Sequence, residues 1–163
     1  MTCIVRRARP EDLAEVGRIT VEAYQHDGHL ASHADYLVVL ADAATRAREA
    51  ELWVAEDDGV VVGSVTYCLP GTPFAELSQD DEGEFRMLSV AAQARGRGVA
   101  EALVRACIQR SRELGHRALV LCSMKEMATA HRLYHRLGFE RLPARDWSPV
   151  AGVDLKAFIL PLD

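Results

Sequence analysis

The sequence predicts an α/β fold: a mixed, mostly antiparallel sheet with a central parallel strand–helix–strand unit and helices on both faces. Three observations carry this prediction. Residues 51–56 and 60–68 are strand patterns separated by the hairpin signal Asp-Asp-Gly at 57–59. Residues 84–90 lead through a glycine-containing turn into a helical pattern. Residues 118–123 form the continuous apolar run of a strand buried on both faces.

The other elements follow from apolar periodicity and from helix start and stop residues. Pro10 with two following acids suits a helix start, and Gly115 and Gly138 suit helix ends. The expected segments are a strand at 2–8, helices at 10–24, 36–50, 96–114 and 127–137, a short strand from Phe139, a loop at 143–152 that carries Trp147, and a last strand at 153–160.

Composition is that of an ordinary globular protein. The 163 residues suit a single domain, 1–163, and are 49% hydrophobic and 26% charged. A net charge of −5 without a basic block argues against a nucleic-acid partner. The four scattered cysteines favour a reducing compartment, and neither a signal peptide nor a membrane span is recognisable. We therefore expect a cytoplasmic protein with no membrane or nucleic-acid partner.

The turn after residues 84–90 has the features of an anion site. Gly96 and Gly98 allow a close approach of the backbone to a ligand, and the helix that starts there offers free N–H groups to phosphate. Arg95 and Arg97 add donors suited to phosphate oxygens. This stretch predicts a strand–loop–helix site, with pyrophosphate as the expected ligand, although a plain tight turn would have the same glycines.

Helix lengths bring a phenol to the same edge of the sheet. The helix from Gly96 runs away for roughly 27 Å, the next strand returns, and the second helix places Tyr134 roughly 12 Å along its axis. Glu84 lies deeper on the strand that precedes the turn. A phenol and a carboxylate are therefore expected to flank a ligand that enters at Gly96 and Gly98.

The chain resembles the GCN5-related N-acetyltransferases (GNAT family). Their acetyl-CoA signature, Gln/Arg-x-x-Gly-x-Gly/Ala, is matched by residues 93–98, preceded by the strand residues 88–90. A second family segment, A-x-x-L-Y-x-x-x-G-F, is matched by residues 130–139. Three positions depart from the family pattern: Ala92 replaces a proline, Ala100 a third glycine and Met127 an asparagine.

The resemblance implies a role for each matched residue. The backbone of the strand would bond the pantetheine arm and polarise the thioester, the N–H groups of the turn would hold the pyrophosphate, Tyr134 would protonate the departing thiolate, and Glu84 would be a general base. The implied cofactor-binding residues are Leu88, Ser89, Val90, Arg95, Gly96, Arg97, Gly98, Val99 and Ala100.

The resemblance further implies transfer of an acetyl group from acetyl-CoA directly to a primary amine, with no metal. A small-molecule amine is the first expectation for the acceptor, and a protein N-terminus or lysine the second; homodimers are common in the family. We expect the acceptor near residues 24–36 and Trp147. The rivals are a non-catalytic acyl-CoA-binding module and a Rossmann or P-loop nucleotide domain; the chain lacks a third glycine and a GK[ST] motif.

Other interpretations stay open for single residues. Tyr134 could be a core aromatic, and Glu84 could form an ion pair with Arg86 instead of acting as a base. The acidic run 76–84 is expected to be a solvated loop, although it could attract an amine. His26, His29 and His33 lack a carboxylate or cysteine at ligand spacing, which argues against a metal site.

Overall fold

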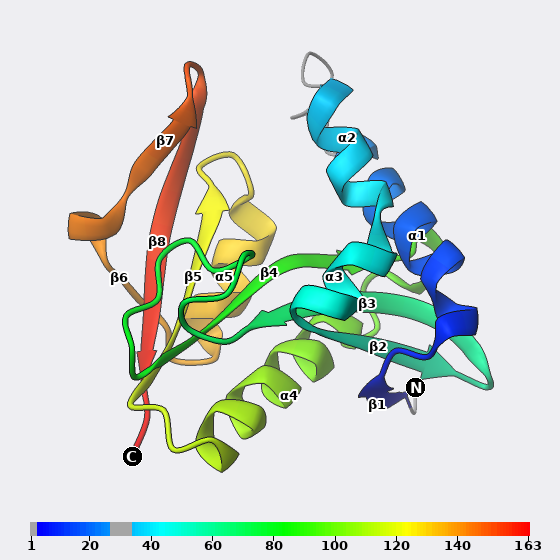
Figure 1. Cartoon of the computed structure of the whole chain (residues 1–163), viewed down its shortest axis with the longest axis horizontal. Helices are drawn as coiled ribbons and strands as arrows, with labels where there is room; N and C mark the ends of the chain where they lie inside the picture. Colours follow the sequence, from blue (N-terminus) through cyan, green and yellow to red (C-terminus); the bar gives the residue numbers. More distant parts are fainter. Residues whose placement is uncertain (1–2, 27–33) are drawn as a thin grey trace.

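The computed structural model describes residues 3–26 and 34–163. These residues form one eight-stranded sheet with helices on both faces (Figure 1), which confirms the predicted fold class. The elements are β1 (Ile4–Arg7), α1 (Leu13–His26), α2 (Ala34–Ala41), α3 (Ala43–Glu49), β2 (Glu51–Asp57), β3 (Val60–Cys68), β4 (Glu82–Val90), α4 (Val99–Glu113), β5 (Ala118–Met124), α5 (Ala128–Arg136), β6 (Glu140–Arg141), β7 (Trp147–Val150) and β8 (Val153–Pro161), with short 3-10 turns at Pro10–Asp12, Ala92–Ala94 and Pro143–Arg145.

The sheet is antiparallel except at its centre. Its order is β1-β2-β3-β4-β5-β8-β6, with β7 paired to β8, and β4–β5 is its parallel pair. Because α4 connects these two parallel strands, the expected strand–helix–strand unit is present. Apolar side chains pack on both faces: one core includes Leu103 of α4 and Tyr134 of α5, and the other includes Val16 and Ile19 of α1.

Two local predictions were wrong. The helix expected over 36–50 is two helices that break at Asp42. This residue caps α3, since its Oδ1 accepts the Thr45 N–H at 3.1 Å and its Oδ2 accepts the Thr45 hydroxyl at 2.7 Å. The loop expected over 143–152 contains the 3-10 turn and strand β7, which begins at Trp147 and pairs with β8.

A buried polar chain links the α2–α3 break to β4. Arg46, 1% exposed, donates to the carbonyl oxygens of Val39 and Leu40 at the end of α2. Its Nη2 also lies 3.5 Å from the Thr20 hydroxyl, and the Thr20 hydroxyl lies 3.3 Å from that of Ser89. Burial lowers the pKa of Arg46. These bonds tie α2 to the strand at the centre of the molecule.

The two central strands are paired only over their first residues and then separate. Pairing runs from Glu82–Ala118 to Glu84–Val120, although β4 continues to Val90 and β5 to Met124. Figure 1 shows β4 and β5 diverging beyond the paired part. The edge of β4 that faces β5 therefore leaves backbone N–H and C=O groups without a strand partner there, and such groups require another partner.

Candidate active site

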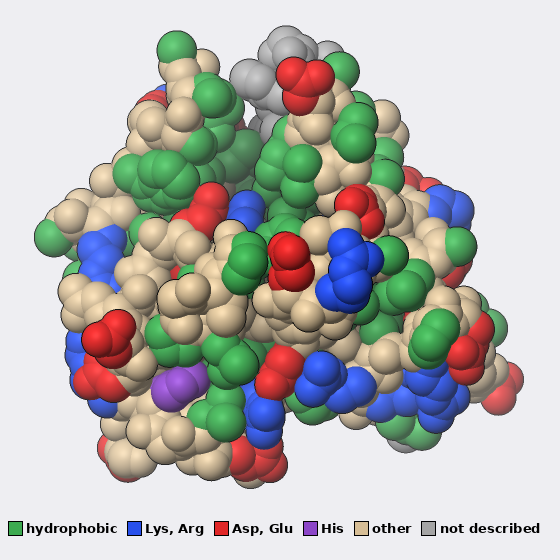
Figure 2. All heavy atoms as spheres, in the orientation of Figure 1, with side chains coloured by type: hydrophobic (Ala, Val, Ile, Leu, Met, Phe, Trp, Pro, Cys, Tyr) green, Lys and Arg blue, Asp and Glu red, His purple; other side chains and the backbone are tan. Residues whose placement is uncertain are grey.

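A cavity of about 1180 Å³ lies where β4 and β5 diverge. It has two ends, which we name after the ligands that the sequence analysis expects there. The cofactor arm runs along β4 from Leu88 to Val90 and on to the start of α4, and the acceptor arm lies between α1–α2 and the β7–β8 hairpin, with Arg86 and Met87 of β4 at its base. Figure 2 shows a hollow between α2 and this hairpin, with hydrophobic side chains on both walls and charged side chains at its base.

The cofactor arm contains nearly every residue expected there. The cavity is lined by Leu88, Ser89, Val90, Arg95, Gly96, Gly98, Val99 and Ala100. Arg97, in contrast, is exposed and is not among the described residues of the lining. Gly96 and Gly98 have φ angles of +76° and +82°, a region that side chains disfavour. The turn thus needs both glycines, and it places the first residues of α4 at the cavity.

A bulge in β4 changes which groups face the cavity. The register with β3 shifts between Ser64 and Thr66, and Met87 has a φ of +57°, in the left-handed region. The hydroxyl of Ser89 turns inward and donates to the Met87 carbonyl at 3.0 Å. Bulges re-aim the residues around them. The Ser89 side chain is thereby engaged in a hydrogen bond within the protein. The backbone of the strand is the part that remains to face a ligand.

Tyr134 lies at the junction of the two arms. It is 4% exposed and lines the cavity, and its ring packs against Phe85, Phe139 and Phe158 with centroid distances of 5.6 to 6.0 Å. Burial raises the pKa of the Tyr134 phenol. Tyr134 is therefore a core aromatic that also borders the cavity, and its role as the acid stays a prediction.

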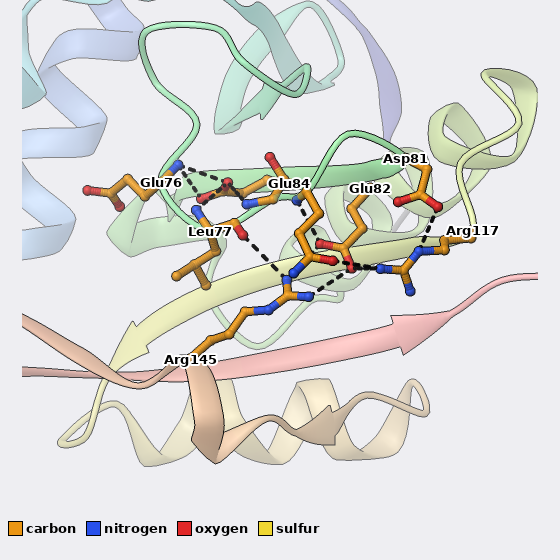
Figure 3. A network of polar contacts seen from close by, with 9 residues as sticks. Glu76, Leu77, Asp81, Glu82, Glu84, Arg117 and Arg145 are labelled. Carbon is orange, nitrogen blue, oxygen red and sulfur yellow. Dashed lines mark hydrogen bonds and ion pairs between the residues drawn. The ribbon is translucent and has the colours of Figure 1, made fainter.

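Glu84 has a different position from the one expected of a base. It is fully buried and is not among the described residues that line the cavity. Its carboxylate accepts the backbone N–H groups of Glu76, Leu77 and Ser78 at 2.9 to 3.1 Å (Figure 3). The alternative ion pair with Arg86 is wrong, because Arg86 Nε pairs with Glu76 at 3.0 Å. Glu84 fixes the course of the β3–β4 loop.

The acidic run is only partly the solvated loop that was expected. Glu82 is fully buried at the start of β4, where Arg145 and Arg117 pair with its carboxylate and Gln79 donates its N–H. Figure 3 shows this cluster beside Glu84 and shows the side chain of Glu76 pointing away from both. Glu76 lines the cavity. One residue of the run therefore supplies a carboxylate to the site.

The sequence analysis assigned no individual side chain to the acceptor arm, although Tyr24 and Tyr36 bound the segment expected there. The acceptor arm is lined by Tyr24, Tyr36, Glu76, Arg86 and Cys122, which come from α1, α2, the β3–β4 loop, β4 and β5. The Cys122 thiol donates to Glu76 Oε1 at 3.7 Å, and burial raises the pKa of this thiol to about 12. No motif joins residues so far apart in the chain. Only the acid count of the run pointed towards Glu76.

The acceptor region agrees partly with expectation. The residues of this region that contribute to the cavity are Tyr24, His26, Ala34, Asp35 and Tyr36, while 27–33, with His29 and His33, lie outside the described residues. Trp147 is 36% exposed and is not among the described lining residues, but Pro149 and Val150 of the same strand are. Within 3–26 and 34–163, no cluster of three or more His, Cys, Asp or Glu could hold a metal, and no helix is long and apolar enough to span a membrane.

Comparison with known proteins agrees with this geometry. Curated relatives include N-acetyltransferase 8 of Rattus norvegicus, 33% identical over 120 residues that make up 71% of this chain and 52% of the relative. N-acetylaspartate synthetase of Homo sapiens is 33% identical over 103 residues, which are 63% of this chain and 32% of the relative. The chain thus spans about half or less of the length of these relatives.

Solved structures match along nearly the whole chain. A ribosomal-protein-alanine N-acetyltransferase from Brucella melitensis has a TM-score of 0.72 and 25% identity over 98% of this chain and 99% of its own. A putative acetyltransferase from Salmonella typhimurium, solved with acetyl-CoA, has a TM-score of 0.68 and 21% identity over 100% and 95%. The model of the acetyltransferase (GNAT) family matches residues 13–139, and the chain belongs to that family.

Proposed function

We propose that this protein is an acetyl-CoA-dependent N-acetyltransferase that acetylates a primary amine of a small molecule. The observation that carries the proposal is the single cavity that joins the open edge of β4, the glycine turn before α4 and the phenol of Tyr134. Its cofactor arm suits acetyl-CoA: the unpaired strand edge matches the amides of a pantetheine arm, and the turn presents a helix N-terminus to a pyrophosphate.

The proposed chemistry needs one proton acceptor and one proton donor. Acetyl-CoA supplies a thioester, whose acetyl group moves to the amine. A primary alkylamine is mostly protonated at pH 7, so a base must take one proton before nitrogen can form its bond to carbon. As the carbon–sulfur bond breaks, Tyr134 donates its proton to sulfur and regains the second proton lost by nitrogen. Backbone N–H groups of Leu88–Val90 polarise the thioester carbonyl.

Glu76 suits the role of the base better than Glu84. Its carboxylate lines the cavity, whereas that of Glu84 is engaged by three backbone N–H groups. Burial raises the pKa of Glu76, while Arg86 opposes this. In this proposal Glu84 acts on the reaction only by holding the loop that presents Glu76.

The test combines binding and turnover. Acetyl-CoA should raise the melting temperature of the protein more than equal concentrations of ATP or NAD, and a panel of primary amines should include some that release CoA thiol. Binding without any turnover would favour the acyl-CoA-binding module, and no selective binding of acetyl-CoA would refute the proposal.

A protein N-terminus is the second candidate for the acceptor, because the similar Brucella protein is named for acetylation of a ribosomal protein. A panel that contains both free amines and short peptides separates the two. The oligomeric state and the cytoplasmic location stay predictions.

A further inference from the structure

Two opposite charges lie side by side in the acceptor arm. Glu76 and Arg86 form an ion pair of 3.0 Å, and their side chains are 23% and 15% exposed. Both line the cavity. The neighbouring lining is largely apolar and aromatic, with Tyr24, Tyr36, Met87, Met124, Met127, Val153 and Leu155. The inner part of this arm thus holds one anion and one cation among apolar walls.

Arg86 keeps hydrogen-bonding capacity for a ligand. A guanidinium has five N–H groups. Arg86 Nε donates to Glu76, Nη1 to the Phe74 carbonyl at 3.2 Å and Nη2 to the Tyr36 hydroxyl at 3.3 Å. These three bonds fix the direction of the side chain and leave one N–H on each Nη. The fork of a guanidinium is suited to a carboxylate.

Charge balance then decides which amine fits. A simple ammonium ion that approaches Glu76 also approaches Arg86, and in a desolvated pocket the repulsion offsets much of the attraction. A molecule with an ammonium beside a carboxylate matches both partners and leaves no charge unpaired. The apolar walls are suited to an apolar or aromatic substituent.

We infer that the acceptor is a free α-amino acid with an apolar or aromatic side chain, whose carboxylate binds Arg86 and whose ammonium faces Glu76. The inference rests on the proposed acetyl transfer and names the substrate class of the same site. Glu76 takes one ammonium proton, the nitrogen–carbon bond forms as the carbon–sulfur bond breaks, and CoA leaves as the thiol. A peptide N-terminus is disfavoured because it has no adjacent carboxylate.

The test uses matched acceptors that differ in the carboxylate. Thiol release should give kcat/KM at least tenfold higher for L-phenylalanine than for 2-phenylethylamine or L-phenylalaninamide, and likewise for L-leucine over 3-methylbutylamine. An alanine-led tripeptide should be a poor acceptor. If amines, amides or peptides react as well as the amino acids, the inference is overturned, while the proposed function stands.

Arg86→Gln sharpens the test. It should lower kcat/KM for L-phenylalanine at least tenfold. It should raise kcat/KM for 2-phenylethylamine, because the repulsion between Arg86 and the ammonium is removed, and so abolish the preference; Arg86→Lys should keep part of the preference. The control is Arg132→Gln, at an exposed arginine of α5, which should keep the wild-type preference. A preference that survives Arg86→Gln contradicts the role of Arg86.

A rise in the melting temperature of Arg86→Gln with acetyl-CoA verifies that this variant is folded. If the variant does not fold, the comparison of matched acceptors with the unmodified protein tests the inference alone. Absence of thiol release with every acceptor would refute the proposed function itself, and this inference with it.

Discussion

The two arms of the cavity are built in different ways. The cofactor arm comes mostly from one continuous segment, residues 88–101, that includes the end of a strand, a turn with two glycines and the start of a helix. The acceptor arm is assembled from single side chains of α1, α2, the β3–β4 loop, β4, β5 and the β7–β8 hairpin. The comparison teaches that backbone geometry forms the arm that matches the family's motif, whereas individual side chains form the arm proposed to bind the acceptor. The two arms should therefore respond differently to substitution.

The largest effect is expected at the junction of the arms. Tyr134→Phe removes the proposed proton donor and should lower kcat roughly 100- to 10,000-fold, the usual size of a general-acid contribution. KM for acetyl-CoA should change little, because the ring remains. Steady-state kinetics with a reactive amine measure both values.

Tyr67→Phe is the matched control for Tyr134→Phe. Tyr67 is another buried tyrosine, whose hydroxyl lies 2.7 Å from that of Ser111, and it is not among the described lining residues. This variant should lose about 1 kcal/mol of stability and keep kcat. Equal turnover by Tyr134→Phe and the unmodified protein across pH would eliminate the acid role.

The carboxylate of the acceptor arm should control the pH profile. Burial raises the pKa of Glu76 above the usual value near 4.5, against the effect of Arg86; Glu84, Cys122 and Tyr36 are the other titratable groups nearby. A base must be ionised, so kcat/KM should fall as pH drops through this raised pKa. Glu76→Gln should lower kcat/KM about 100-fold and remove this acidic limb.

Glu140→Gln, at an exposed residue of β6, is the control for Glu76→Gln. It should reproduce the unmodified pH–rate profile. If the acidic limb of the pH–rate profile persists in Glu76→Gln, the limb belongs to another titratable group.

Substitutions of Glu84 and Glu76 should differ in the free energy of unfolding that they cost. Glu84→Ala leaves three backbone N–H groups of the β3–β4 loop without their acceptor and should cost about 2 kcal/mol of unfolding free energy. Glu76→Ala removes a partly exposed ion pair and should cost less than about 1 kcal/mol. Urea denaturation compares the two variants. A reversed order would contradict the structural role of Glu84.

The smallest effect is expected at the glycine turn. Gly98→Ala places a side chain at a φ of +82°, which costs about 1–2 kcal/mol and should raise KM for acetyl-CoA roughly tenfold without affecting KM for the amine. Gly115→Ala imposes similar strain at a φ of +74° after α4, away from the described lining. Gly115→Ala should lower the stability of the protein without changing KM for acetyl-CoA. If Gly115→Ala also raises this KM, the increase in Gly98→Ala does not come from contact of the turn with acetyl-CoA.

The contrast between the arms also explains what could be predicted. Strand periodicity, the hairpin signal and the glycine turn act over a few residues, so the fold class and the cofactor arm were readable. The break at Asp42 and strand β7 were missed, because a side-chain cap and pairing with β8 decided them. Glu84 was expected to be a base because the resemblance to the family implies that role for its position. Which carboxylate of the acidic run reaches the cavity depends on the path of a loop, and periodicity does not encode that path.

The open edge of β4 also bears on how long the molecule survives. A sheet with unpaired backbone groups is incomplete, and a pantetheine arm bonded along that edge would serve as a missing strand. A ligand that binds only the folded state adds about 2.7 kcal/mol at a concentration 100 times its dissociation constant. If acetyl-CoA binds there as proposed, its supply would influence resistance to proteolysis as well as turnover, and starvation for acetyl groups would shorten the protein's lifetime.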